Sequence, residues 1–341
     1  MRIAYSPCPN DTFVFHAWAH GLIPDAPPLE VTYADIDITN KLAANRSGPE
    51  VMKISYAALP WVLEDYTLLP CGGALGRGCG PLVLTRGTGN RPPTADAAGE
   101  AVTEAALETL EDATALAALP VPSGGERLTN PAAAGSLSTD GPPDVSLTPA
   151  MGSADPAQLS GKRVAVPSER STAYLLFRLW AAAHVPGGVG EIIVLPFHEI
   201  MPAVRDGRID AGLVIHEARF TYPDYGLQLM TDLGSWWESD TGLPIPLGAI
   251  IARRGQDASR IADWIRASVR CAWADPEASS NYVMAHAQEM SQDVAKAHID
   301  LYVNRYTEEL GEDGYAAVTA LLGRAMAEEL VPAFDLALLR Q

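Results

Sequence analysis

Residues 163–183 read RVAVPSERSTAYLLFRLWAAA. The first four, Arg163–Val166, suit a buried strand, and a polar turn then leads into an apolar run over 172–183 that predicts a helix. A strand joined to a helix by a short polar turn is the repeating unit of α/β proteins. The stretch therefore indicates an α/β fold, and the same unit recurs on both sides of it.

Alternating strands and helices extend through most of the chain. Before residue 87 we expect strands at 2–5, 29–34, 51–54, 67–70 and 81–85, and helices after the turn at 6–11, around 38–44 and over 55–63. After residue 183 we expect strands at 192–195, 210–215, 227–231 and 247–252, a helix at 199–206, and mostly helix beyond 257. This βαβα order predicts mainly parallel sheets with helices on both faces.

Residues 88–158 interrupt the alternation. They contain no Phe, Trp or Tyr, are rich in Ala, Pro, Gly, Ser and Thr, and carry more acidic than basic side chains. Such a composition buries too little apolar surface to offset the entropy of ordering the chain. We expect a disordered acidic insertion here, without a catalytic residue.

Two α/β lobes are predicted around this insertion. If the helical C-terminal segment returns to the first sheet, residues 1–86 and 249–341 form a large lobe and residues 159–248 a small one. Two hinge crossover strands, near 81–86 and 244–252, would join them. A length of 341 residues suffices for two such cores. The predicted fold is a two-lobed α/β clamp, the arrangement of solute-binding proteins.

Charge and composition narrow the class of protein. The 24 basic and 42 acidic residues give a formal net charge of −18, which opposes binding to nucleic acid or to an anionic membrane. No apolar run approaches the roughly 18–20 residues of a membrane span, and no signal peptide is recognisable, so we expect a cytoplasmic protein. The four cysteines lack metal-ligand or disulfide spacing, and we expect no metal site. The choice between monomer and homodimer stays open.

Two predicted helix starts carry hydroxyls suited to a small anion. Ser55 follows the strand 51–54, and Thr172 begins the helix after 163–166. A helix start offers unpaired N–H groups and the positive end of a dipole, and ligands of open parallel sheets bind beyond the strands' carboxyl ends. One such start in each lobe predicts a site for a small anionic substrate, although either hydroxyl alone is also an ordinary helix cap.

His216 is the best candidate for a general base. It follows the apolar strand 210–215, where a side chain faces the ligand side of a sheet, and its reference pKa of about 6.5 allows proton exchange near neutrality. Glu217 and Arg219 are candidates to orient it or to bind substrate, and Cys8 is a weaker candidate nucleophile. His298, within a C-terminal helix, is expected to be a surface or packing residue.

Several segments together resemble one family. They are SPCPNDTF at 6–13, KISYAA at 53–58, GGALGRG at 72–78, STAY at 171–174, IHEARFTY at 215–222 and GLPIPLG at 242–248. In this order they cover nearly all of the chain outside 88–158. The chain resembles the 1,4-dihydroxy-6-naphthoate synthases, lyases of the futalosine pathway to menaquinone.

The resemblance implies a type II periplasmic-binding-protein-like fold and a cytoplasmic carbon-carbon lyase. Such an enzyme would convert cyclic de-hypoxanthine futalosine to 1,4-dihydroxy-6-naphthoate without a metal or an organic cofactor. The family's substrate contacts fall on Lys53, Ile54, Ser55, Thr172 and Ala173. The family's proton acceptor falls on His216, and Asn40, after the second strand, is a further expected contact.

Two other functions stay open at this point. Chorismate dehydratase, the pathway's other clamp-type enzyme, is the nearest rival, although the segment HEARF at 216–220 favours the naphthoate synthase. The rival from another class is a non-catalytic cytoplasmic solute-binding or sensor protein. Turnover of the futalosine derivative distinguishes the three.

Overall fold

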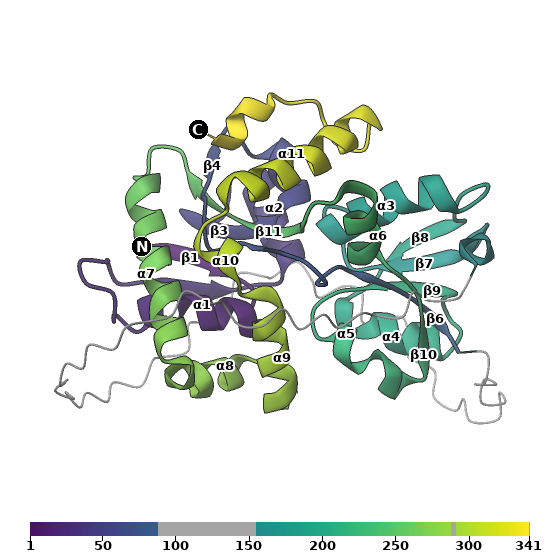
Figure 1. The fold of residues 1–341 in the computed structure, drawn as a ribbon, viewed down its shortest axis with the longest axis horizontal. Coiled ribbons are helices and arrows are strands. Elements are labelled where there is room, and N and C mark those ends of the chain that lie inside the picture. Colours follow the sequence, from purple (N-terminus) through teal and green to yellow (C-terminus); the bar gives the residue numbers. More distant parts are fainter. Residues whose placement is uncertain (88–154, 288–290, 341) are drawn as a thin grey trace, which may run out of the picture. The chain divides into compact units, whose positions relative to one another are not determined.

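The first of two β-sheets combines strands from the beginning of the chain with one from its last third (Figure 1). The computed structural model describes residues 1–87, 155–287 and 291–340. The sheet contains β1 (Arg2–Tyr5), β2 (Glu30–Tyr33), β3 (Val51–Ser55), β4 (Tyr66–Leu68), β5 (Ala74–Gly76) and β11 (Ile245–Arg253). Its order is β2-β1-β3-β11-β4, with β5 also paired to β11; β1, β2 and β3 are parallel, and β11 is antiparallel to its neighbours.

The second sheet has the order β10-β6-β9-β7-β8. Its strands are β6 (Leu82–Arg86), β7 (Arg163–Val166), β8 (Glu191–Val194), β9 (Ala211–Val214) and β10 (Leu227–Asp232). Strands β7, β8 and β9 are parallel, whereas β6 is antiparallel to both β9 and β10. Each sheet is thus built around three parallel strands, which agrees with the predicted α/β class.

Helices accompany both sheets. The first half of the chain contributes α1 (Pro9–Ala19), α2 (Ile36–Ala44) and the 3-10 helix η1 (Tyr56–Trp61), and the middle contributes α3 (Thr172–His184), α4 (Phe197–Arg205), α5 (Ala218–Thr221) and α6 (Leu233–Thr241). The last part contributes α7 (Ala258–Ala274), α8 (Ser280–His286), α9 (Gln292–Tyr302), α10 (Arg305–Glu308) and α11 (Gly311–Ala327). Strand β5 and helices α5 and α6 are additions to the strands and helices expected from the sequence.

Alternating strand residues pack against opposite layers of helices. In β1, Tyr5 belongs to the same buried cluster as Trp18 of α1 and Ile265 of α7, whereas Ala4 belongs to a cluster with Val318 of α11. In the second sheet, α3 and α6 cover one face and α4 the other. Successive strand side chains point to opposite faces, so a sheet covered on both sides needs apolar residues at nearly every position.

Strand β6, which the sequence predicts as a crossover strand at the end of the segment 1–86, pairs with the second sheet. The chain therefore crosses between the sheets before Leu82, within the glycine-rich stretch. Gly80 lies at this crossing, and a Cβ atom added there would stand 2.1 Å from the backbone nitrogen of Gly234. The lobe boundaries at 159 and 249 stay predictions.

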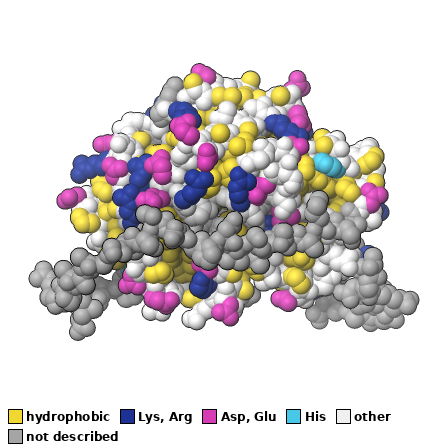
Figure 2. Space-filling model, in the orientation of Figure 1, with side chains coloured by type: hydrophobic (Ala, Val, Ile, Leu, Met, Phe, Trp, Pro, Cys, Tyr) yellow, Lys and Arg dark blue, Asp and Glu magenta, His cyan; other side chains and the backbone are white. Residues whose placement is uncertain are grey.

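The predicted insertion at 88–158 lies outside the described residues, except for 155–158. These lead into the 3-10 helix η3 (Pro156–Leu159), where the Asp155 carboxylate accepts a hydrogen bond of 2.9 Å from the Ala157 N–H. Within the described ranges, every helix is too short or too polar to cross a membrane. Figure 2 shows acidic and basic side chains interspersed over the described part of one face.

Candidate functional site

Ser55, Thr172 and His216 lie at the strand ends and helix start where the sequence predicts them. Ser55 is the last residue of β3, Thr172 is the first residue of α3, and His216 follows β9. The cap of α3 is not Thr172 but Ser171, whose hydroxyl accepts a hydrogen bond of 3.2 Å from the Tyr174 N–H. The hydroxyl of Thr172 is therefore available for contacts outside its own helix.

Thr172 connects α3 of the second sheet with elements of the first. The Ala57 N–H donates to Thr172 Oγ1 over 3.2 Å, and the Thr172 hydroxyl donates to the Leu247 carbonyl oxygen over 2.9 Å. Ala57 belongs to η1 and Leu247 to β11. Ala173, also predicted as a substrate contact, is buried beside Thr172, and the N–H groups of this first helical turn have no acceptor within their own helix.

Asn40 and Ser55 form a buried hydrogen-bonded pair. The Ser55 N–H donates to Asn40 Oδ1 over 2.8 Å, and Asn40 Nδ2 donates to Ser55 Oγ over 3.1 Å and to the Arg170 carbonyl over 3.4 Å. The helix expected after Ser55 is present as the 3-10 helix η1, which contains Pro60. Since proline lacks an N–H, it cannot donate a backbone bond in an α-helix. The hydrogen bonds between Asn40 and Ser55 show that the structure brings these two predicted site residues together.

Lys53 forms a buried ion pair within the protein. Its ammonium group contacts Asp11 Oδ1, and both side chains are almost fully buried. Burial raises the pKa of the Asp11 carboxyl, and the adjacent ammonium of Lys53 opposes that rise. The lysine stem needs the space at Gly248, where an added Cβ atom would stand 2.9 Å from Lys53 Cε. The side chain of Ile54 is also in the core, so its backbone alone can meet a ligand.

His216 is held in an uncommon backbone conformation beside a thiol. Its φ of 52° lies in the left-handed region, which His adopts more readily than most residues and which often marks functional sites. Its Nδ1 atom is 3.6 Å from Cys8 Sγ, and that sulfur is 2.9 Å from Ser6 Oγ. The ring of Phe197 meets the imidazole edge-on at 5.7 Å.

Cys8 does not have the environment of a nucleophile. Burial, followed by the charge of Asp11, raises the pKa of the Cys8 thiol well above its usual range. The thiolate is the reactive form, and here it is disfavoured. The protonated thiol instead offers a hydrogen-bonding partner to the imidazole of His216.

The sequence predicts a surface or packing role for His298, but the structure places it beside His216. It is 1% exposed, and its ring stacks on that of His216 with centroids 6.1 Å apart. The signal for its burial is the spacing of α9, since Ala295, His298 and Tyr302 are the buried residues of that helix. A histidine at a buried position of this stripe calls for a functional or structural explanation.

Arg219 has a structural partner. Its guanidinium forms a 2.6 Å ion pair with Asp232 and donates over 3.0 Å to the carbonyl of Gly80, which fixes the crossing between the sheets. Glu217 stands at the beginning of the short helix α5. Among the described residues, neither side chain forms a hydrogen bond or an ion pair with the His216 side chain.

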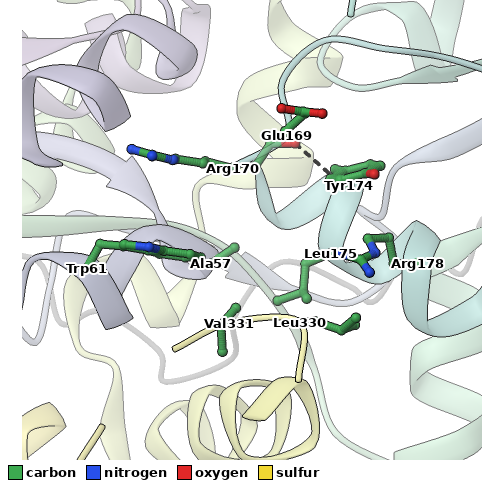
Figure 3. Close-up of a pocket in the computed structure, with 10 residues that line it drawn as sticks. Ala57, Trp61, Glu169, Arg170, Tyr174, Leu175, Arg178, Leu330 and Val331 are labelled. Carbon is green, nitrogen blue, oxygen red and sulfur yellow. Dashed lines mark hydrogen bonds between the residues drawn. The ribbon is translucent and has the colours of Figure 1, made fainter. Parts of the chain in front are cut away.

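A small surface hollow adjoins the Thr172 contact (Figure 3). Ala57 and Trp61 of η1, Arg170, Tyr174 of α3 and Val331 are among the residues that line it. The guanidinium of Arg170 lies over the Trp61 ring at 5.7 Å. His216 and Lys53 do not line this hollow. Across the residues that the structure describes, His, Cys, Asp and Glu side chains form no group of three or more that could hold a metal ion.

Known proteins resemble this chain over nearly its whole length. A family model described as Menaquinone biosynthesis matches residues 1–119 and 145–327. A 1,4-dihydroxy-6-naphthoate synthase of Streptomyces coelicolor is 56% identical, over 98% of this chain and 95% of that protein. The protein of the same name from Thermus thermophilus is 38% identical, over 97% of this chain and 95% of that protein.

Solved structures resemble this chain in fold. A protein of Archaeoglobus fulgidus has a TM-score of 0.71 and 28% identity, over 97% of this chain and 98% of that one. The periplasmic aliphatic sulphonate binding protein of Escherichia coli has a TM-score of 0.58 and 12% identity, over 99% and 90%. This likeness confirms the predicted periplasmic-binding-protein-like fold. With the family model and both relatives, it follows that the chain belongs to the 1,4-dihydroxy-6-naphthoate synthase family, lyases of menaquinone biosynthesis.

Proposed function

We propose that this chain cleaves cyclic de-hypoxanthine futalosine to 1,4-dihydroxy-6-naphthoate and a sugar-derived fragment, with His216 as the general base. The observation that carries the proposal is the contact between His216 Nδ1 and the thiol of Cys8. It joins a residue that follows β1 to one that follows β9, at the strand ends where ligands of such folds bind. A titratable ring fixed at that position suits proton transfer.

The thiol leaves one nitrogen of His216 free to act. We assign the hydrogen of the neutral ring to Nδ1, which then donates to Cys8 Sγ, while the thiol hydrogen is directed to Ser6 Oγ. Nε2 carries no hydrogen in this tautomer and is the basic atom. Because the raised pKa of the Cys8 thiol keeps it protonated, the sulfur does not compete for the substrate as a nucleophile.

The anionic end of the substrate would bind at the hydroxyl-bearing turns. The first turn of α3, at Thr172 and Ala173, offers backbone N–H groups and the positive end of a helix dipole. Ser55, oriented by both ends of the Asn40 amide, offers a hydroxyl from the other sheet. A carboxylate held from two sides in this way places the remaining ring system toward His216.

Proton removal would start the carbon-carbon cleavage. His216 Nε2 takes a proton from the substrate, and the electron pair left behind forms a new double bond in the departing fragment as the carbon-carbon bond breaks. The pair of the broken bond passes to a ring oxygen of the naphthoate fragment, which then takes up a proton and becomes a phenol. Formation of the aromatic naphthoate ring favours the products. A positioned base of this kind typically contributes about 10²–10⁴-fold in rate.

Substrate entry requires the direct contacts between the two sheets' elements to separate. They include the hydrogen bonds of Thr172 with Ala57 and Leu247, of Asn40 with Arg170, and of Cys8 with His216. These polar contacts are close to the proposed substrate position. We propose that they open to admit the substrate and close around it, which aligns the reacting atoms and excludes water.

Mass spectrometry of the purified protein with cyclic de-hypoxanthine futalosine tests the activity. We expect 1,4-dihydroxy-6-naphthoate from the wild type. His216→Asn is the informative variant, because Asn tolerates a positive φ but cannot serve as the base. It should fold, retain naphthoate binding and lose at least about 100-fold in kcat.

Three results would contradict the proposal, each in a different way. Near-normal turnover by His216→Asn removes His216 as the base. Binding of the futalosine derivative without turnover supports a sensor, and indifference to it with loss of water from chorismate supports the dehydratase.

A further inference from the structure

His298 is a buried imidazole that lacks a protein hydrogen-bonding partner. Both ring nitrogens, Nδ1 and Nε2, are inaccessible to solvent and make no hydrogen bond among the described residues. A neutral imidazole has one donor and one acceptor, and leaving either unmade in the interior costs folding free energy. Buried polar groups without a partner are rare in native proteins and point to a function or a missing ligand.

The surroundings of His298 keep its ring uncharged. Burial, the neighbouring His216 and the ammonium of Lys53 lower the pKa of His298 well below its usual range. The His298 ring also meets the aromatic ring of Tyr302 at 4.6 Å, and burial raises the pKa of that phenol. A ring in this position is a neutral donor of hydrogen bonds and a poor base, unlike His216.

The position of His298 relative to His216 restricts what its N–H can reach. The two rings are nearly parallel, 23° apart, with centroids separated by 6.1 Å. Once the contacts between the two sheets' elements have opened for the substrate, an oxygen next to the carbon that faces His216 would come within reach of a nitrogen of His298. The ring system of the proposed substrate gains negative charge on oxygen when the base removes the proton, because the product carries phenolic oxygens.

We infer that His298 is a second catalytic residue, which donates a hydrogen bond from its neutral ring to the substrate oxygen that gains negative charge as His216 removes the proton. This inference rests on the proposed function. A donor aimed at developing charge in a water-excluded site stabilises the transition state more than the bound substrate. Loss of one such donor typically lowers kcat about 10²–10³-fold.

Three substitutions separate catalysis from packing. His298→Phe keeps a ring of similar shape for the stack with His216 and Tyr302 but removes both nitrogens. His298→Asn and His298→Gln place an amide N–H near the position of Nδ1 or Nε2. His286→Phe is the matched control, because His286 is also on a helix and its ring packs at 4.3 Å against Tyr33 rather than against His216.

We expect His298→Phe to lower kcat while KM and stability stay nearly unchanged or, for stability, improve. His298→Phe should lose at least about 100-fold in kcat with KM within about 3-fold, and its thermal midpoint should be unchanged or higher, since two unpaired polar groups are gone. One of the amide variants should recover at least about 10-fold of that loss. His286→Phe should keep wild-type kcat. A kcat of His298→Phe within about 3-fold of wild type, or an effect on KM alone, overturns the inference.

A binding measurement keeps this test separate from the proposed reaction. In protein labelled with ¹⁵N-histidine, addition of 1,4-dihydroxy-6-naphthoate should shift the ring ¹⁵N resonances that are missing in His298→Phe. Failure of the wild type to cleave the futalosine derivative refutes the proposed function, whereas the shift still reports whether His298 meets a naphthoate oxygen. No shift at saturating naphthoate overturns the inference.

Discussion

Cys8 Sγ lies 3.6 Å from His216 Nδ1, although 208 positions separate the two residues in the sequence. Cys8 caps the start of α1 after the first strand of one sheet, and His216 follows β9 of the other. Burial raises the pKa of the Cys8 thiol, so the hydrogen stays on sulfur. The geometry therefore suits a thiol that orients an imidazole rather than one that attacks a substrate.

Replacement of Cys8 should slow the reaction without abolishing it. We expect about a 10-fold lower kcat in Cys8→Ala, because His216 loses the partner that fixes its tautomer, and a smaller loss in Cys8→Ser. Steady-state kinetics check this, with the exposed Cys271→Ala as the unaffected control. A folded Cys8→Ala protein without any turnover would instead indicate a nucleophilic thiol.

Thr172 should show the energetic value of its two hydrogen bonds. Thr172→Val keeps the side-chain shape but leaves the Ala57 N–H and the Leu247 carbonyl without their partner. We expect a loss of about 1–3 kcal/mol in the free energy of unfolding and a higher KM. Thr172→Ser retains the hydroxyl and should resemble the wild type in denaturant unfolding. Equal stability of the two variants would show that these bonds contribute nothing.

Local sequence rules locate Ser55, Thr172 and His216 because each follows from chain-neighbour patterns. An apolar run followed by a polar turn identifies the end of a buried strand, and strand ends of parallel sheets share one edge. The same rules miss β5, whose three residues, Ala74–Gly76, are too short to give a periodic signal. They also do not give the strand partners of β6, which the sequence indicates only as a crossover, since strand pairing is a long-range property that no local pattern encodes.

Local sequence rules also cannot identify the partners of the site residues, because these contacts join distant parts of the chain. Nothing near Cys8 specifies His216, and nothing near Lys53 specifies Asp11. His298 is an intermediate case. The period of α9 places it on the buried stripe with Ala295, yet the identity of the residue stacked upon it depends on how two distant parts of the chain pack. The contacts that combine these strand ends into a candidate active site are therefore seen only in the three-dimensional structure.

The buried ion pair should respond differently to single and double replacement. Lys53→Met leaves the Asp11 carboxylate buried without a counter-charge, and we expect a loss of about 3–5 kcal/mol in the free energy of unfolding. Adding Asp11→Asn removes that charge and should recover much of the loss. Denaturant unfolding measures both. The exposed pair of Lys41 and Asp37 is the control, and Lys41→Met should cost less than about 1 kcal/mol.

Additive effects would contradict this reading of the pair. If the loss in the double variant equals the sum of the two single losses, the ammonium and the carboxylate do not interact. A strongly negative coupling free energy, in contrast, identifies Lys53 as a structural partner of Asp11 and leaves substrate binding at this position to the backbone.

His298 should make the protein less stable as the pH falls below about 6.5. Its pKa is lowered in the folded state, mainly by burial, so the unfolded chain takes up a proton that the native protein does not. Native stability is therefore unaffected well above the unfolded pKa and declines as the pH drops through it, by about 1.4 kcal/mol per pH unit. His298→Phe lacks this proton. The difference in unfolding free energy between His298→Phe and wild type should be constant above pH of about 7.5 and should grow in favour of the variant at lower pH. Parallel curves down to pH of about 5 would mean that His298 binds its proton equally well in both states, which its burial beside His216 and Lys53 opposes.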